Sequence, residues 1–394
     1  MLVFLLLLLL DDPRKLIERG VAALDANDLA GAEASFESAT RQAPTNASAW
    51  MLLTQTHARR GDMKSAQKAA VQAERFGGKD AAILQGLATF YGSVAQDLPR
   101  AAALGARYAQ LAPSDGNAWP RVAALYLAIG KPELAIEAGL RAKPSAELKV
   151  ILGKAYLERK EWAKADAAFS EAVRMSPYDE DTRFAAAQGR LLHQDFAGAE
   201  QVVLEARKVF DKSAQLELTL GVAYYAQRKF SKAVEQFLLT IRLAPDMPQP
   251  YAFLGRILEH AGDRLPEATE RFAALEQKHP ESPLGYLLHA KALLAQLPAT
   301  GFPPEAEQAL ELVEKAVSLA KADAEAQFQY GALLFRKGDL AGAVLRLERS
   351  AQLNGKDSAV HFQLARVYSA MGRKDDAARE RGLHEKLAEL EKAK

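Results

Sequence analysis

Apolar and small side chains recur along the chain in pairs of helical stripes. In residues 146–179, two sets of side chains follow spacings of one, three and four residues: Leu152, Gly153 and Tyr156, and then Ala165, Phe169 and Ala172. Such spacing places each set on one face of a helix. Similar pairs of stripes occur elsewhere in the chain, where turn signals containing glycine, such as RRGD at 59–62 and RKGD at 336–339, separate the two stripes. The pattern predicts two amphipathic helices joined by a short turn.

This two-helix pattern repeats with a period close to 34 residues. Small residues mark one position of each copy, here called the anchor: Gly20, Thr54, Ala88, Ala123, Gly153, Ala187, Gly221, Gly255, Ala290, Gly331 and Ala365. The steps between anchors are 34, 34, 35, 30, 34, 34, 34, 35, 41 and 34 residues. Twelve residues after most anchors comes an alanine: Ala32, Ala66, Ala135, Ala165, Ala199, Ala233, Ala343 and Ala377. One helix pair cannot bury its own apolar stripes, so neighbouring copies must stack.

The anchors, the alanines and the aromatic positions between them resemble the tetratricopeptide repeat. The resemblance covers residues 13–394 and implies an all-α fold, an α-solenoid superhelix of about eleven helix-turn-helix repeats with a C-terminal capping helix. We expect the repeats near 13–46, 47–80, 81–115, 116–145, 146–179, 180–213, 214–247, 248–282, 283–323, 324–357 and 358–394.

Departures from the period predict local irregularities. The 30-residue step predicts a shortened second helix near Pro144, and the 41-residue step predicts a loop at 297–304. That loop is either a contact site or a tolerated insertion, and tolerated insertions are the commoner case. The charged segment 374–394 carries Leu383, Leu387 and Leu390 on one stripe and is expected to form the solvating cap of the array.

Charge and composition narrow the function. The 394 residues include 51 basic and 50 acidic side chains, giving a formal charge of +1. We therefore expect no electrostatic field of a single sign over the molecular surface, and we predict no nucleic-acid partner. The absence of cysteine from the sequence excludes disulfides, thiolate metal sites and cysteine nucleophiles.

An apolar run, Leu2–Leu10, opens the chain within an N-terminal segment 1–12. Nine residues are too few to cross a bilayer, for which about 20 are needed. The run fits the apolar core of a signal peptide, although no basic residue precedes it and no small-residue cleavage site follows. We expect a signal peptide remnant, an exported or periplasmic protein and no transmembrane span in the mature chain. The alternatives are a first helix hidden under the fold and a cytoplasmic protein.

No motif for chemistry emerges from the sequence. None of the seven histidines pairs with another at metal-ligand spacing, and P-loop, nucleophile-elbow and dinucleotide-loop patterns are absent from the sequence. His57 and His361 fall on helix packing positions, where a buried structural histidine is the usual case. We predict no catalytic residue, no cofactor and no metal site, and therefore no enzyme.

The resemblance places the partner groove on the first helix of each repeat, at offsets two, five, nine and twelve. These offsets are separated by three, four and three residues and lie on one helical face. The selected candidates are Phe184, Gln188, Leu218, Tyr225, Arg256, Glu259, Phe328, Phe335, Phe362 and Arg366. The alternative for each aromatic residue is packing against the neighbouring repeat. The Lys and Asn clamp by which some family members hold a C-terminal carboxylate is not supplied at Val21, Gln55 and Thr89 or at Val150 and Lys154.

These observations favour a non-catalytic scaffold that binds segments of one or more partner proteins in the concave groove, seated by apolar anchors. The alternative is an accessory or regulatory subunit of a secretion or polysaccharide-assembly machine whose catalytic part is on another chain.

Overall fold

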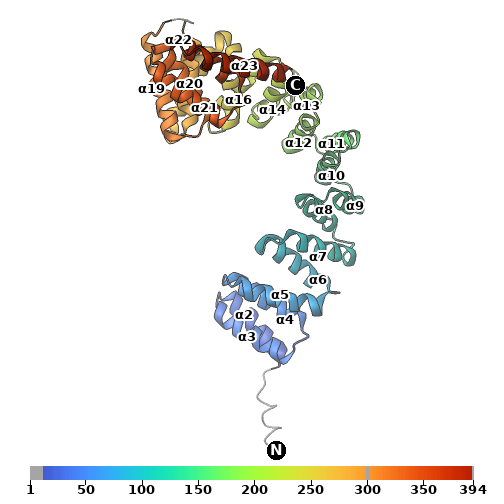
Figure 1. Ribbon diagram of the computed structural model, residues 1–394. Helices are drawn as coiled ribbons and strands as arrows, with labels where there is room; N and C mark the ends of the chain where they lie inside the picture. Colours follow the sequence, from blue (N-terminus) through green and yellow to red (C-terminus); the bar gives the residue numbers. More distant parts are fainter. Residues whose placement is uncertain (1–11, 299–300, 393–394) are drawn as a thin grey trace, which may run out of the picture. The chain divides into compact units, whose positions relative to one another are not determined.

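The described part of the chain is entirely helical. The computed structural model describes residues 12–298 and 301–392, and no strand occurs within them (Figure 1). The chain divides into two compact parts, an N-terminal part Met1–Asp195 and a C-terminal part Phe196–Lys394. The predicted all-α repeat array is confirmed, and each part is described below by itself.

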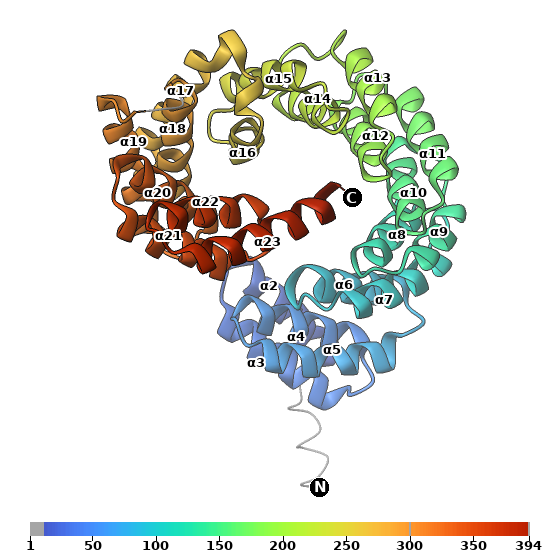
Figure 2. The same ribbon diagram turned by 45° about the horizontal axis from the view of Figure 1, so that its top comes forward.

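The N-terminal part is a stack of helix pairs. Even-numbered helices begin each pair and are called first helices; odd-numbered helices are called second helices. Each helix packs on the next, and α4 also touches α6, while α10 touches both α8 and α12 (Figure 2). The helices are α2 (Pro13–Asp25), α3 (Leu29–Gln42), α4 (Ala47–Arg59), α5 (Met63–Gly77), α6 (Ala81–Thr89) with the π-helical turn η1 (Phe90–Val94), α7 (Leu98–Leu111), α8 (Ala118–Ala128), α9 (Pro132–Leu140), α10 (Ala146–Glu158), α11 (Trp162–Met175) and α12 (Glu180–Leu192).

The C-terminal part continues the same pattern with one interruption. Two short 3-10 turns, η2 (Leu258–His260) and η3 (Gly262–Arg264), separate α16 from α17, and both of these helices contact α18. The helices are α13 (Phe196–Ala206), α14 (Ala214–Ala226), α15 (Phe230–Leu243), α16 (Pro248–Arg256), α17 (Leu265–Lys278), α18 (Pro283–Ala295), α19 (Pro304–Leu319), α20 (Ala324–Lys337), α21 (Leu340–Leu353), α22 (Ser358–Ala370) and α23 (Lys374–Lys392).

Small residues sit where helices of a pair approach most closely. All eight alanines that follow an anchor by twelve residues are fully buried, at no more than 1% exposure. A Cβ atom placed on Gly153 would lie 2.8 Å from the ring of Phe169, and one on Gly221 would lie 2.6 Å from Phe237. In both repeats the ring follows the glycine by sixteen residues. The glycine therefore provides the space that the aromatic ring fills.

Turns within the helix pairs place one residue in the left-handed region of backbone space. Glycine occupies this position in several turns, with φ of 82° at Gly61, 66° at Gly130 and 93° at Gly338. Other turns use a residue with a side chain: Asn27, Gln96, Lys160, Gln194 and Arg228. Aspartate commonly ends the turn as the cap of the second helix, as where Asp62 accepts a hydrogen bond from the Ser65 amide at 3.0 Å.

Each irregular step of the period corresponds to an irregular element. The 30-residue step contains α9, which has 9 residues where α11 has 14. The 41-residue step contains a loop between α18 and α19, and Arg336 of α20 donates hydrogen bonds to the carbonyl groups of Pro298 and Gly301 in that loop. The two 35-residue steps contain η1 and the η2–η3 break, and in these repeats the buried alanine, Ala101 or Ala268, follows the anchor by thirteen residues.

The structure describes most of the last helix of the array but little of the N-terminal segment. The predicted segment 1–12 lies outside the described residues except for Asp12, which caps α2 by accepting a hydrogen bond from the Arg14 amide. At the other end, α23 is 19 residues long and leaves Leu383 and Leu390 exposed. Within the residues that the structure describes, no helix has both the length and the apolar character that crossing a bilayer requires.

Candidate partner-binding groove

Three cavities lie between successive first helices of the N-terminal part. The first, about 560 Å³, lies between α4 and α6; the second, 360 Å³, lies between α6 and α8; and the third, 500 Å³, lies between α10 and α12. Cavities of this size are typical of sites that receive side chains or small ligands. We call the surface that contains them the first-helix face.

Some of the residues lining these cavities occupy the offsets two, five, nine and twelve within their repeats. On α10 all four positions line the third cavity, and on α12 three of them do. The lining residues at these offsets are Met51, Gln55 and Ala58; Ala82, Gln85, Thr89 and Gly92; Ala124; Glu147, Val150, Lys154 and Leu157; and Asp181, Phe184 and Gln188. The same register describes most of the first-helix residues that line the first and third cavities, but in the second cavity it includes only Ala124 among the residues that α8 contributes.

Phe184 and Gln188, both selected from the sequence, lie together in the third cavity. Phe184 is half-buried and Gln188 is exposed. Across the cavity, α10 presents Val150 and Lys154, and Phe169 of α11 also lines it. The cavity combines apolar walls with an amide, an ammonium group and carboxylates, so it can seat an apolar side chain and hold polar backbone groups beside it.

An ion pair between Asp115 and Arg121 lies at the edge of the second cavity. Asp115 accepts a hydrogen bond from the Tyr108 hydroxyl at 2.9 Å and forms an ion pair with Arg121, and both of these partners line the cavity. The bond from Tyr108 holds the pKa of the Asp115 carboxyl below its ordinary value, and the same bond raises the pKa of Tyr108. Because the carboxylate stays ionised, it balances the guanidinium. Gln85, Thr89 and Ser93 then supply uncharged polar groups.

In the C-terminal part, two of the selected residues, Tyr225 of α14 and Arg256 of α16, contact the ring of Phe253. Leu218 and Tyr225 of α14 are half-buried. The Tyr225 ring lies 5.5 Å from the ring of Phe253, and the Arg256 guanidinium lies 5.7 Å from the same Phe253 ring. Tyr225 therefore packs against the next repeat, which was the alternative role expected for the aromatic groove candidates.

Glu259 does not share a helix with Arg256. Helix α16 ends at Arg256, and Glu259 falls in the 3-10 turn η2, where its side chain is 81% exposed and lies 3.6 Å from His260. The offset rule assumes a first helix that continues through position twelve, and this repeat lacks that last turn.

The remaining selected residues form a cation–aromatic cluster on α20 and α22. The Arg366 guanidinium lies 5.2 Å from the centre of the Phe335 ring and 5.8 Å from that of Phe362. Phe362 is 46% exposed, whereas Phe335 is half-buried against the apolar core of these repeats. Phe328 is also half-buried against this core. Phe362 and Arg366 are therefore the accessible members of the set.

Several lining residues were passed over by the selection from sequence. Gln85 was not considered, and Gln55, Thr89, Val150 and Lys154 were considered only for a carboxylate clamp, which they do not form. The signal that finds them is the same offset rule applied to the repeats that contain α4, α6 and α10.

The comparison with protein families decides the kind of repeat. The family model described as "Tetratricopeptide repeat" matches residues 17–82, 123–180 and 184–248. These three segments are therefore assigned to the tetratricopeptide repeat. The resemblance inferred from the anchors is confirmed over these segments. A search of curated proteins found no match.

Solved structures of bacterial tetratricopeptide repeat proteins are similar to this chain. One from Parabacteroides merdae has 18% identity, covers 62% of this chain and 98% of its own, and gives a TM-score of 0.40. The C-terminal part of one from Cytophaga hutchinsonii has 15% identity, covers 60% of this chain and 99% of its own, and gives a TM-score of 0.47. A protein from Thermus thermophilus has 24% identity, covers 45% of this chain and 92% of its own, and gives a TM-score of 0.39.

Proposed function

We propose that this tetratricopeptide repeat protein is a non-catalytic scaffold that binds a segment of a partner protein along its first-helix face. The observation that carries the proposal is the register shared by the first and third cavities. Side chains at the offsets two, five, nine and twelve line both of them, so an extended or helical segment meets similar subsites in the repeats that contain them.

The chemistry of the lining suits a peptide of mixed character. Met51, Val150 and Phe184 offer apolar contacts, while Gln85 and Gln188 offer amides that can pair with a peptide backbone. Acidic and basic side chains both occur, and the whole chain carries a formal charge of +1. A strongly charged polymer would need one sign of charge along its path. We therefore expect apolar side chains of the partner to provide most of the affinity.

Phe184→Ala tests the proposal. In the full-length chain, we expect this change to weaken partner capture about tenfold or more, because aromatic anchors in clefts carry much of an interface's free energy. Recovery of the partner from native-host extracts is measured by quantitative mass spectrometry across a concentration series. The matched control is Phe76→Ala, which removes a 37% exposed ring from the second helix α5. Equal recovery by both variants would contradict the proposal.

We also propose that the protein is exported. The nine-residue apolar run Leu2–Leu10 supports this proposal. Cell fractionation combined with mass spectrometry of the native N-terminus tests it. We expect a processed chain outside the cytoplasm, and an intact Met1 on a cytoplasmic chain would contradict it.

A further inference from the structure

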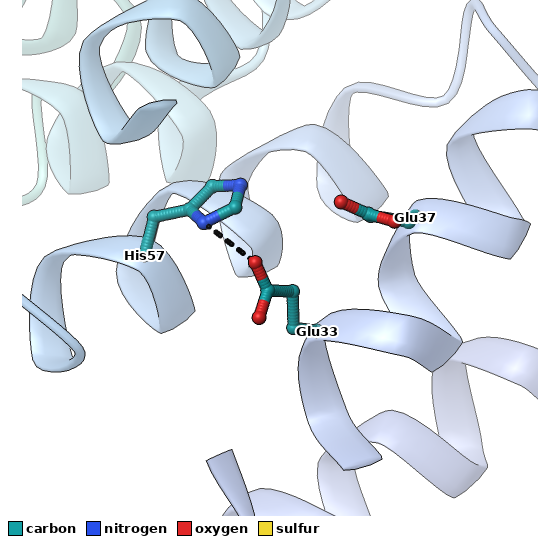
Figure 3. A group of neighbouring side chains, drawn as sticks. All are labelled: Glu33, Glu37 and His57. Carbon is teal, nitrogen blue, oxygen red and sulfur yellow. Dashed lines mark ion pairs between the residues drawn. The ribbon is translucent and has the colours of Figure 1, made fainter. Parts of the chain in front are cut away.

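Two carboxylates and an imidazole converge between the first two repeats. Glu33 and Glu37 lie one turn apart on α3, and His57 lies near the end of α4 (Figure 3). One ligand atom from each of the three side chains lies within 4.8 Å of the other two. Throughout residues 12–298 and 301–392, no other group of three or more His, Asp or Glu side chains meets this condition.

The imidazole is buried without a hydrogen bond on the atom that faces the carboxylates. His57 is 7% exposed, and its Nδ1 atom has no hydrogen-bond partner among the described residues. Figure 3 shows this atom directed at Glu33, whose Oε1 atom lies 3.3 Å away, a contact that is an ion pair when the imidazole is protonated. When the imidazole is neutral and carries its lone pair on Nδ1, two acceptor atoms face each other, and a bound cation would satisfy both of them.

The distances suit a small divalent ion. Zinc binds nitrogen and oxygen ligands at about 2.0–2.1 Å in tetrahedral geometry, which puts neighbouring ligand atoms about 3.3 Å apart. The distance between His57 Nδ1 and Glu33 Oε1 has this value. The Glu37 side chain is 44% exposed and can turn toward the pair by rotation of its side chain.

Two arginines balance the carboxylates without blocking the ligand atoms of Glu33 and His57. Arg60 forms an ion pair with Oε2 of Glu33, while Oε1 of Glu33 faces His57. Arg41 lies 3.4 Å from Oε2 of Glu37, and its own side chain is 68% exposed. Such partners orient the carboxylates from outside, as charged neighbours do around metal ligands. The exposed Arg41 can also leave toward solvent.

We propose that Glu33, Glu37 and His57 bind one Zn²⁺ ion. An imidazole with two carboxylates is a donor set for a borderline transition metal rather than for Ca²⁺ or Mg²⁺, which take oxygen ligands. Three protein ligands leave a fourth position open. A cavity of 610 Å³ lies beside the cluster, and Glu37, Arg41, His57 and Lys68 are among the residues that line it, whereas Glu33 is not. The ion links α3 to α4 and therefore joins two successive repeats.

Calorimetric titration of the full-length, tag-free chain with Zn²⁺ tests the proposal. We expect a stoichiometry of one, and we expect Glu37→Gln to weaken the site at least about tenfold, because it removes a ligand. The matched control is Glu137→Gln on α9. Glu137 also pairs with an arginine four residues later, Arg141, but does not belong to the cluster. Equal affinities in Glu37→Gln and the native chain, or no binding of Zn²⁺, would overturn the proposal.

Hydrogen exchange provides a readout independent of affinity and of folding in a variant. In the native chain, saturating Zn²⁺ should slow amide exchange in residues 29–59 more than in residues 146–175, because bound metal stabilises the native contacts between α3 and α4. Uniform or absent protection would place any bound ion elsewhere and overturn the assignment.

Discussion

At the residue scale, the fold depends on glycines that make room for rings. The Phe169 ring is 2% exposed and lies between Gly153 of α10 and Gly189 of α12. A Cβ atom on Gly153 would approach the ring to 2.8 Å, and one on Gly189 would approach it to 2.5 Å. Because backbone flanks the ring on both sides, the ring cannot move away from a new methyl group on either side.

Gly153→Ala should therefore destabilise the protein. Overpacking costs about 1–3 kcal/mol, while alanine gains about 1 kcal/mol over glycine in a helix, so we expect a net loss of roughly 1 kcal/mol in the free energy of unfolding. Urea denaturation followed by circular dichroism measures it. The control is Gly382→Ala on α23, where a Cβ atom meets nothing within 4 Å and the variant should gain stability. A similar gain in both variants would contradict the packing account.

Glu217 on α14 provides a pH-dependent test at the same scale. This residue is 1% exposed, its Oε1 atom lies 3.0 Å from Nε of Arg207, and its Oε2 atom has no hydrogen-bond partner among the described residues. Burial raises the pKa of the carboxyl above its ordinary 4.5, and Arg207 opposes this only in part. The protonated form is thus favoured in the folded state. Its stabilising contribution is complete below the ordinary pKa and is lost as the pH rises through the raised value.

Glu217→Gln stays neutral at every pH and should escape this loss. The melting temperature of the variant relative to the native chain should therefore rise as the pH increases from about 4, and level off above the raised pKa. Thermal denaturation across this range measures the difference. Glu205→Gln, at an exposed position of α13, serves as the control. A difference that is constant with pH would contradict the assigned pKa direction.

At the element scale, spacing in the sequence predicted helix pairs and some of their irregularities. The short α9 and the loop before α19 were predicted because losing or adding several residues leaves few alternatives. The sequence did not predict how the single extra residue in each 35-residue step changes the helix. It can widen a helix, as in η1, or break one, as at η2 and η3, and the spacing of apolar residues is similar in both cases.

The fourth repeat should be less protected against amide exchange than the second. Neither Asn117 before α8 nor Lys131 before α9 caps its helix with a side-chain hydrogen bond, whereas Asn46 and Asp62 cap α4 and α5. Amide exchange should therefore be faster in residues 118–140 than in residues 47–77. Lys131→Asp should slow exchange in α9, since an N-cap contributes about 1 kcal/mol. Equal protection in the two repeats would contradict the expectation.

At the scale of the whole molecule, the sequence predicts a helical face for partner binding but does not indicate which residues on that face are accessible. Phe184 and Tyr225 occupy the same face of their repeats, yet Phe184 lines a cavity and Tyr225 packs on Phe253. The difference depends on the neighbouring repeat, where an aromatic ring meets Tyr225. The Glu33–Glu37–His57 cluster was missed for a similar reason, because the crossing of α3 and α4 brings together residues twenty or more positions apart.

Site-specific photo-crosslinking tests the central claim most directly. A photoreactive amino acid is placed at Gln85 or Gln188 on the first-helix face, or at Lys68 or Val71 on α5, where another cavity lies. In full-length chains expressed in the native host, the two first-helix positions should yield the same partner protein, and the two α5 positions should not. Adducts of that partner from α5 positions alone, or equally from both surfaces, would contradict the account.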